Sequence, residues 1–491
     1  MISFVCSFIS GLFTALAGAE RCFSILSFFA PTLFAFICKK SPEKCLPYSF
    51  FYGFALWGGS CLWIFELYFN GYLPSLGLTF FALLALSVIG GMILTVGFLP
   101  FYFFSKSGFP FLFSFTFSYL LSEFIPSAMG RFSFPWTSLA ASVSCFTPFL
   151  QTASVGGSLS VSLIIIVING FFALALSEIK NKKRFIFYFF VAIAVFFSNL
   201  SFGFLRMARP LTGEKISVAI VQGNIAADGK WTTDKTDTLF LYSELCRLIC
   251  EENEPSLIIL PETSYPWTDN VSAVSAFSSL SKKLDSCIVF GCFEEENGQI
   301  FNSAHVSSPD GSVLGSYRKR RLVPFGEYDP FGILPSDLVG NISFGGRGGV
   351  IETPVCDIGF LICFESLFSS LNRQNSADGS DITVIMTNDS WFGKSSALYR
   401  HLSHAVLRAV ESGRSVVCAA NTGISCVISS MGEITASVPN NTTAVFCSET
   451  EKITDGTLYS SVGDVIIFAA LYLLLQFEFF LESVYTSACI D

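Results

Sequence analysis

The apolar residues of this chain are concentrated in its first two hundred positions and in one late stretch. The 491-residue sequence is 52% hydrophobic and only 14% charged, and its mean hydropathy is +0.58. Such a composition is typical of membrane proteins rather than of soluble ones. Most of the charged residues lie between about 210 and 455. We therefore expect a helical membrane domain and a more polar domain in the same chain.

A helix needs about 20 mostly apolar residues to cross a hydrocarbon layer of ~30 Å. Eight segments come close to this requirement, at 2–18, 22–38, 48–66, 77–104, 109–126, 158–177, 185–204 and 462–480. We expect a membrane domain over 1–204 with about seven helices, and a last helix with a short cytoplasmic tail within 456–491. Residues 17–19 (AGA) resemble a signal-peptide cleavage site, but no Lys or Arg precedes the apolar run, so we expect it to be retained.

The distribution of Lys and Arg between the short loops predicts the orientation, because cytoplasmic loops carry the excess. With a cytoplasmic N-terminus, eight of these residues fall in inner loops and four in outer ones. The inner ones are Lys39, Lys40, Lys44, Lys106, Lys180, Lys182, Lys183 and Arg184, and the outer ones are Arg21, Arg131, Arg206 and Arg209. Seven crossings then place the polar block outside the cytoplasm.

The polar block, from about 210 to 455, alternates short apolar runs with amphipathic or polar segments. Six of the runs read as buried strands, at 215–222, 256–260, 287–292, 359–363, 382–386 and 415–420. Segments 234–252 and 399–413 have helical spacing. The block is therefore predicted to be an α/β domain that is long enough to bury its own core.

Polar residues follow several of these strands at the point where each strand ends. Glu262 follows 256–260, Cys363 ends 359–363, and Asn388 follows 382–386, while Lys319 comes after a strand-like segment at 312–317. In α/β sheets, functional groups gather just past the carboxyl ends of the strands. We therefore expect these side chains to converge on one site.

Glu262, Lys319 and Cys363 are residue types that could together perform acyl transfer. A free thiol with a pKa of ~8.5 is mostly protonated at neutral pH, so a nucleophilic Cys363 needs a base or a nearby cation. Glu262 is the candidate base, and Lys319 is the candidate donor to the oxyanion of a tetrahedral intermediate. Taken singly, each has an ordinary alternative: a packed thiol, a solvated carboxylate and a surface charge. Only their joint occurrence favours catalysis.

The composition argues against some other functions. A formal charge of −9 and the lack of a basic stripe in the polar block argue against a nucleic-acid partner. His401 and His404 are spaced like a metal pair on a helix, but no HExxH or Cys/His signature accompanies them. We therefore expect neither a metal nor another cofactor. The nine cysteines of the block leave at least one thiol unpaired if no bridge leaves it.

The motifs around the three residues resemble those of the nitrilase, or carbon-nitrogen hydrolase, superfamily. They are LPET at 260–263, YRKRRLVPFGE at 317–327, ICFE at 362–365, TNDSWF at 387–392 and RAVESGR at 408–414. This resemblance implies an αββα sandwich and a Glu-Lys-Cys triad made of Glu262, Lys319 and Cys363.

Together with VQGNI at 221–225, LVPFGEY at 322–328 and the apolar segments, these motifs resemble the apolipoprotein N-acyltransferases, bacterial inner-membrane enzymes of lipoprotein maturation. The resemblance implies a ping-pong reaction with the catalytic domain on the periplasmic side. Cys363 would take an acyl chain from a phospholipid, typically phosphatidylethanolamine. The thioester would then acylate the α-amino group of the diacylglyceryl-cysteine of an apolipoprotein.

The same resemblance implies supporting roles for five further residues. Glu327 would orient Lys319 or Glu262, while Trp231, Phe364 and Glu365 would line the site or its acyl entrance, and Asn388 belongs to the TNDSWF motif. Position 364, often Tyr in this family, is Phe here, so the hydroxyl that a hydrogen-bonding role needs is missing, while an apolar or stacking role stays open.

Two other functions are consistent with parts of the sequence. A membrane-anchored amidase would resolve the thioester with water, and its site would not need to open toward the bilayer. A transporter with an extracytoplasmic domain would carry paired charges or broken helices in its membrane half, and the sequence offers few of either.

Overall fold

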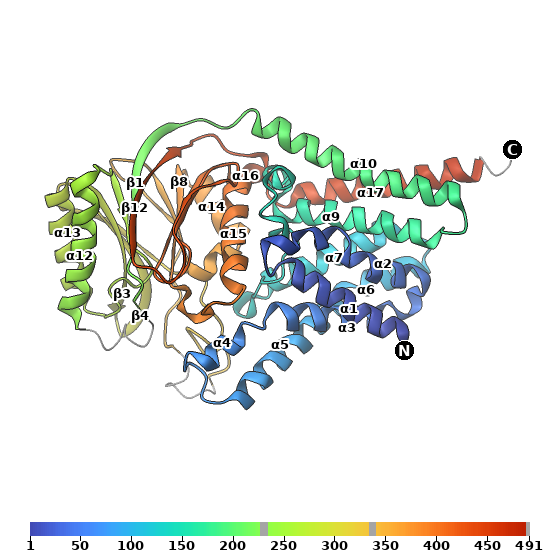
Figure 1. Ribbon diagram of the computed structural model, residues 1–491, viewed down its shortest axis with the longest axis horizontal. Helices are drawn as coiled ribbons and strands as arrows, with labels where there is room; N and C mark the ends of the chain where they lie inside the picture. The colour runs from blue at the N-terminus through green and yellow to red at the C-terminus, as the bar shows by residue number, and fades with distance from the viewer. Residues whose placement is uncertain (226–233, 333–339, 488–491) are drawn as a thin grey trace. The chain divides into compact units, whose positions relative to one another are not determined.

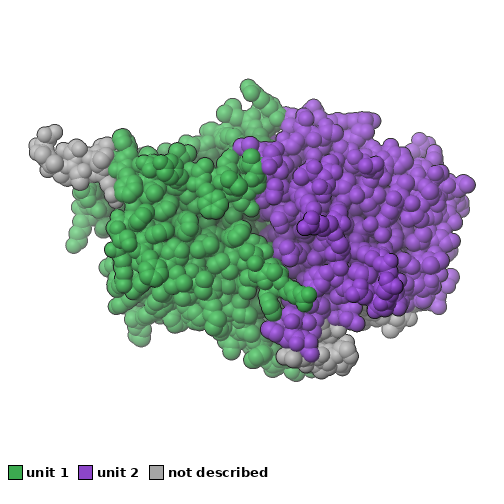
Figure 2. Space-filling model, turned by 180° about the vertical axis from the view of Figure 1, so that it is seen from behind, with its two compact units in different colours: residues 1–209, 395–403, 462–491 green, residues 210–394, 404–461 purple. Residues whose placement is uncertain are grey.

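The computed structural model describes residues 1–225, 234–332 and 340–487, with side chains to Leu481. The chain divides into two compact units, which Figure 2 colours green and purple. Unit 1 comprises Met1–Arg209, Ser395–Ser403 and Val462–Asp491, and unit 2 comprises Pro210–Lys394 and His404–Ser461.

Unit 1 is built of helices (Figure 1). They are α1 (Ile2–Ala17), α2 (Ala30–Lys40), α3 (Cys45–Ser60), α4 (Ile64–Phe69), α5 (Leu76–Gly97), α6 (Leu99–Lys106), α7 (Phe111–Ala128), α8 (Thr147–Leu150), α9 (Ala153–Ser177), α10 (Lys182–Met207) and α17 (Val465–Ser487). Each of the eight expected segments is largely helical. Within the described residues, five helical stretches are long and apolar enough to cross a membrane, while α1 and α17 are apolar but shorter. The count of eight spans therefore stays a prediction.

Three of the expected helices are each divided into two elements. A 3₁₀ helix over Arg21–Phe28 precedes α2, α3 is followed by α4, and α5 is followed by α6. Pro31 and Pro100 lie in the first turns of α2 and α6. Proline has no N–H to donate but fits the first turn, where that donor has no intrahelical partner, so it marks where a helix restarts.

Helix α9 is interrupted close to its beginning. Gly156 and Gly157 have non-helical backbone angles, and Gly157 adopts φ 67° and ψ −170°, a conformation that glycine reaches most easily. The regular helix therefore runs from Ser158, which agrees with the predicted start of the segment 158–177.

Unit 2 contains two six-stranded sheets. The first has the order β12-β1-β2-β3-β4-β5, and its strands are β1 (Glu214–Gln222), β2 (Leu257–Ile259), β3 (Cys287–Glu296), β4 (Gln299–Ser307), β5 (Val313–Arg318) and β12 (Ala444–Lys452). The second has the order β11-β10-β9-β8-β7-β6, and its strands are β6 (Val350–Ile351), β7 (Ile358–Ile362), β8 (Ile382–Thr387), β9 (Ser415–Ala420), β10 (Cys426–Ile428) and β11 (Ile434–Ser437). All six predicted strands are confirmed. Strand β4 was not predicted.

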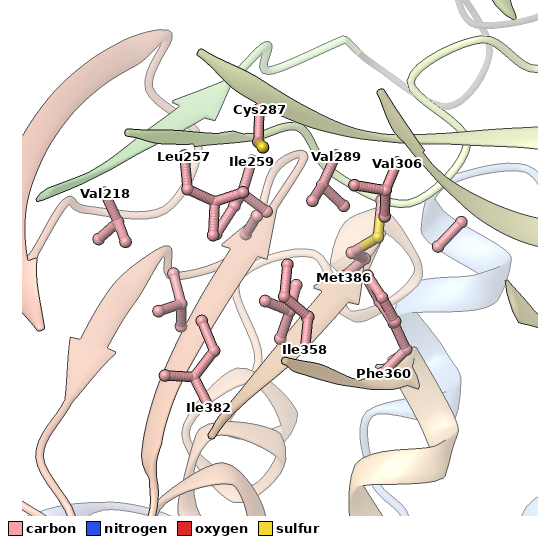
Figure 3. Packing of buried hydrophobic residues seen from close by; sticks show 14 of the residues in the cluster. Val218, Leu257, Ile259, Cys287, Val289, Val306, Ile358, Phe360, Ile382 and Met386 are labelled. Carbon is pink, nitrogen blue, oxygen red and sulfur yellow. The ribbon is translucent and has the colours of Figure 1, made fainter. Parts of the chain in front are cut away.

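The two sheets pack face to face around one apolar core. Alternate residues of each central strand point inward, such as Leu257 and Ile259 of β2 and Ile382 and Met386 of β8 (Figure 3). This alternation follows from the two-residue period of a β-strand. Every residue of β2 and β8 is buried, so the two faces differ in the apolar cluster that they join: Leu257 and Ile259 belong to the core between the sheets, whereas Ile258 belongs to the cluster under the helices.

Helices cover the outer faces of the sheets. α12 (Lys235–Glu252) and α13 (Asn270–Leu284) pack on the first sheet, where Tyr242, Phe277 and Phe290 belong to a second apolar cluster. α14 (Ser369–Ala377) packs on β7, and Asn372 of α14 donates to the carbonyl of Arg408 in α15 (Ala397–Ser412). The result is the αββα sandwich that the sequence resemblance implies (Figure 1).

Candidate active site

The site lies just past the carboxyl ends of several strands. Ile259 of β2 is followed by Glu262, Ile362 of β7 by Cys363, and Met386 of β8 by Asn388. Parallel strands end at the same edge of a sheet, so the residues that follow them come together. Glu262 contacts Lys319, and the charges of both residues act on the Cys363 thiol.

Glu262 presents a buried carboxylate with three donors around it. Oε1 accepts hydrogen bonds from Lys319 Nζ at 3.1 Å and from Asn302 Nδ2 at 2.7 Å. Oε2 accepts one from the backbone N–H of Asn388 at 2.8 Å. The side chain is 6% exposed. Three donors fix both oxygens, so the carboxylate is held in one orientation toward the site.

Lys319 is a buried ammonium between two carboxylates. Its Nζ lies 3.1 Å from Glu262 Oε1 and 2.8 Å from Glu327 Oε1. Burial alone would lower the pKa of Lys319, but the charges of Glu262 and Glu327 outweigh it and raise the pKa well above the usual value. Lys319 therefore stays positively charged at neutral pH and can donate to a developing negative charge.

Cys363 occupies a strained turn at the end of β7. Its φ of 50° places it in the left-handed region, which is uncommon for a residue other than glycine and is found at functional sites. Burial first, and then the charge of Glu262, raise the pKa of the thiol well above its usual value, although Lys319 opposes them. The resting thiol is therefore protonated, and its nucleophilic attack requires a base.

Glu365 ties the turn of Cys363 to the segment that carries Lys319. Its Oε2 accepts from the Tyr317 hydroxyl at 2.6 Å and from the backbone N–H of Ile362 at 2.8 Å. Its Oε1 accepts from the backbone N–H groups of Arg320 at 2.6 Å and Arg321 at 3.0 Å. Burial raises the pKa of Glu365, and these donors oppose the rise. Glu365 thus links the two loops.

The other predicted supporting residues lie at different places. Glu327 contacts Lys319 through Oε1 and accepts the backbone N–H of Val323 through Oε2 at 2.8 Å. Phe364 is buried and packs edge-on against Phe368, with ring centres 5.3 Å apart. Trp231 lies outside the described residues.

Two asparagines that the sequence reading missed belong to the site. Asn302, in β4, donates to Glu262, and Asn421, after β9, donates to Asn388 Oδ1 at 3.0 Å. Asn421 also bridges to Ile225, accepting from its N–H and donating to its carbonyl. The signal for Asn421 was its position directly after the predicted strand 415–420. Asn302 carried no comparable signal because β4 itself was not predicted.

The comparisons with known proteins cover both parts of the chain. Residues 217–450 match the family model "Carbon-nitrogen hydrolase", and residues 10–171 match the "Apolipoprotein N-acyltransferase N-terminal domain". The apolipoprotein N-acyltransferase of Geobacter metallireducens is 34% identical over 359 residues, which cover 69% of this chain and 68% of the relative. That of Gloeobacter violaceus is 30% identical and covers 70% and 68%, respectively.

A third relative extends the match further. The apolipoprotein N-acyltransferase of Haemophilus ducreyi is 28% identical over 411 residues, which cover 75% of this chain and 79% of the relative. These relatives support the acyltransferase interpretation over the amidase alternative, and they agree with a chain that contains both several apolar helices and a sandwich domain. This chain belongs to the apolipoprotein N-acyltransferase family of bacterial membrane proteins.

Proposed function

We propose that this protein transfers a fatty acyl chain from a phospholipid, through a thioester on Cys363, to the α-amino group of the diacylglyceryl-cysteine that begins an apolipoprotein. Glu262 is the general base and Lys319 the oxyanion donor of a ping-pong reaction. The observation that carries the assignment is the buried Glu262 carboxylate, fixed by three donors, beside a thiol whose pKa is raised.

The first half-reaction forms the thioester. Cys363 Sγ attacks the ester carbonyl of the phospholipid while its proton passes to Glu262. The Lys319 ammonium stabilises the oxyanion, a contribution whose loss typically raises the barrier by about 2.7 to 4 kcal/mol. When the intermediate collapses, the bond between the carbonyl carbon and the ester oxygen breaks. Glu262 returns its proton to that oxygen, and the lysophospholipid leaves.

The second half-reaction regenerates the thiol. The neutral α-amine of the apolipoprotein attacks the thioester carbonyl, and Glu262 takes the proton that the nitrogen loses. The carbon–sulfur bond then breaks, an amide remains on the lipoprotein, and Cys363 recovers a proton from Glu262. One base therefore serves both halves, because each nucleophile delivers a proton that each leaving group needs.

The membrane helices fit a reaction between two lipid-anchored substrates. We place the protein in the bacterial inner membrane with the catalytic domain, residues 210–455, on the periplasmic side, because Lys and Arg are more frequent in the loops that this orientation makes cytoplasmic. The donor is proposed to be phosphatidylethanolamine. Its ester bonds lie near the headgroup plane, so the thiol must be held close to the bilayer surface.

The test is intact-protein and peptide mass spectrometry after incubation with phosphatidylethanolamine in mixed micelles. We expect an acyl adduct on Cys363 that a diacylglyceryl peptide then discharges. Cys363→Ala should abolish the adduct, and the matched variant Cys356→Ala, at a buried cysteine of the apolar core, should retain it. An adduct on Cys356 instead, or discharge by water alone at the same rate, would overturn the proposal.

A further inference from the structure

We propose that Asn302 is a positioning residue that fixes the Glu262 carboxylate and sets the pH range in which this carboxylate accepts the thiol proton. The inference rests on the proposed function of Glu262 as the base. It concerns a residue of β4 that the motifs around Glu262, Lys319 and Cys363 do not include.

Asn302 contacts Glu262, Glu327 and the backbone of Lys319. Its Nδ2 donates to Glu262 Oε1 at 2.7 Å and lies 3.4 Å from Glu327 Oε1. Its backbone carbonyl accepts the N–H of Lys319 at 2.8 Å. The residue is 3% exposed. The buried side chain of Asn302 therefore contacts both carboxylates, and its backbone carbonyl binds the backbone N–H of the residue that carries the ammonium, Lys319.

The strand register explains why Asn302 faces the site. Ala304 and Val306 of β4 belong to the core between the sheets, so Asn302 continues the same inward series. Ser303 pairs with Arg318 of β5, which brings Asn302 opposite Lys319. Directly opposite residues of an antiparallel pair project to the same face. Asn302 and Lys319 thus approach Glu262 together.

The orientation of the Asn302 amide indicates what the residue is for. Within the described residues, Oδ1 of Asn302 is buried and has no hydrogen-bond partner. Turning the amide over would place this oxygen against the carboxylates of Glu262 and Glu327. A buried asparagine that only filled space would be expected to pair both of its ends. Here the donor end is aimed at the carboxylates, and the acceptor end is left without a partner.

The charges around the site predict the effect of removing this donor. Glu262 lies beside the Lys319 ammonium, which also contacts the second carboxylate, Glu327. The charge of Glu262 acts on the Cys363 thiol, and so does that of Asp389, in the segment after β8 of the same sheet as Cys363. A hydrogen bond donated to a carboxylate favours its ionised form. Without the amide, a higher pH is needed to keep Glu262 ready to accept a proton.

The experiment measures the rate of acyl-Cys363 formation from phosphatidylethanolamine as a function of pH, with full-length Asn302→Ala and Asn302→Asp in mixed micelles. We expect the acidic limb of the rate profile to move to higher pH by about one pH unit for Asn302→Ala, since hydrogen bonds to charged groups have about this effect. Asn302→Asp adds a third carboxylate and should move the limb further. An unmoved limb in both variants would overturn the inference.

The matched control is Asn372→Asp. Asn372 is also a buried asparagine of unit 2, but its amide bonds Arg408 and Thr383. Asn372→Asp should lower thermal stability without moving the acidic limb of the rate profile, and an equal shift in this variant would also overturn the inference.

If Asn302→Asp does not fold, Asn302→Ser takes its place, and the outcome is again either a moved or an unmoved limb. A wild type that forms no acyl adduct would contradict the proposed function instead. The pH profile of Cys363 alkylation by iodoacetamide then tests Asn302 without any lipid.

Discussion

Charged residues gather on both faces of the sheet at strands β4 and β5. The cluster on the inner face and the cluster on the outer face are built differently. The inner cluster consists of Glu262, Glu327 and Lys319, with two carboxylates for one ammonium. The outer cluster consists of Glu294, Glu296, His305 and Arg318. In the outer cluster, Glu294 Oε1 lies 2.8 Å from His305 Nε2, and Glu294 Oε2 lies 2.6 Å from Arg318 Nε.

The two clusters differ in how their charges are compensated. Burial would raise the pKa of Glu294, but His305 and then Arg318 outweigh it and lower the pKa to about 2. In the inner cluster, the carboxylate of Glu262 instead helps to raise the pKa of the Cys363 thiol. The outer carboxylate is therefore locked in its charged form, whereas the inner one lies beside a proton that it can receive. Because successive residues of a strand point to opposite faces, β4 and β5 keep the outer ion cluster apart from the cluster that we propose to be catalytic.

The largest expected effect comes from Glu262→Gln in the inner cluster. The rate of acyl-Cys363 formation should fall by about 10²–10⁴-fold, because an amide cannot take the thiol proton. Time courses of the adduct by mass spectrometry measure this rate. Glu294→Gln is the matched control, since it makes the same change in the outer cluster, and it should leave the rate nearly unchanged. Equal rates for Glu262→Gln and wild type would remove Glu262 as the base.

Lys319→Met should slow the same reaction by about 10²–10³-fold, because the oxyanion loses a charged donor. It should also lower the melting temperature, since Glu262 and Glu327 are then left buried without their cation. The two readouts are obtained on the same sample by adduct formation and thermal unfolding. If only the melting temperature changes, Lys319 is a structural cation like Arg318.

Glu294→Gln should reduce stability by about 2 kcal/mol at neutral pH, the usual contribution of a hydrogen bond to a charged group. The pKa of Glu294 is about 2 in the folded protein and about 4.3 in an unfolded chain. Its ionisation therefore stabilises the fold above about pH 4.3, and this contribution is lost as the pH falls toward 2. Denaturant unfolding should show wild type and variant converging on acidification. A difference that is independent of pH would indicate lost packing instead.

The smallest effect is expected for Glu449→Gln, at the exposed ion pair with Lys215, whose atoms lie 2.8 Å apart. Solvent screens such a pair, so neither the melting temperature nor the rate of adduct formation should change measurably. A clear loss of stability would show that the pairing of β1 with β12 depends on this contact.

Much of this architecture was predictable from local patterns. The strands from 215–222 to 415–420 are short apolar runs, and the strand-end rule indicated where Glu262, Cys363 and Asn388 would meet. Three predicted membrane helices proved to be divided, two of them at the prolines that begin α2 and α6. Strand β4 was missed because NSAHVS is polar in composition, although its even-numbered residues face the core.

The separation of apolar and polar parts, the family motifs and the candidate residues Glu262, Lys319 and Cys363 follow from the sequence alone. The partners of these side chains became known only from the folded protein. Asn302 reaches Glu262 because β4 pairs with β5, and Glu365 reaches Arg320 because the turn of Cys363 lies beside that segment. The physical reason is that hydrogen bonds between side chains depend on register across strands far apart in sequence. A local pattern specifies that a strand forms, but it does not specify what lies opposite each residue.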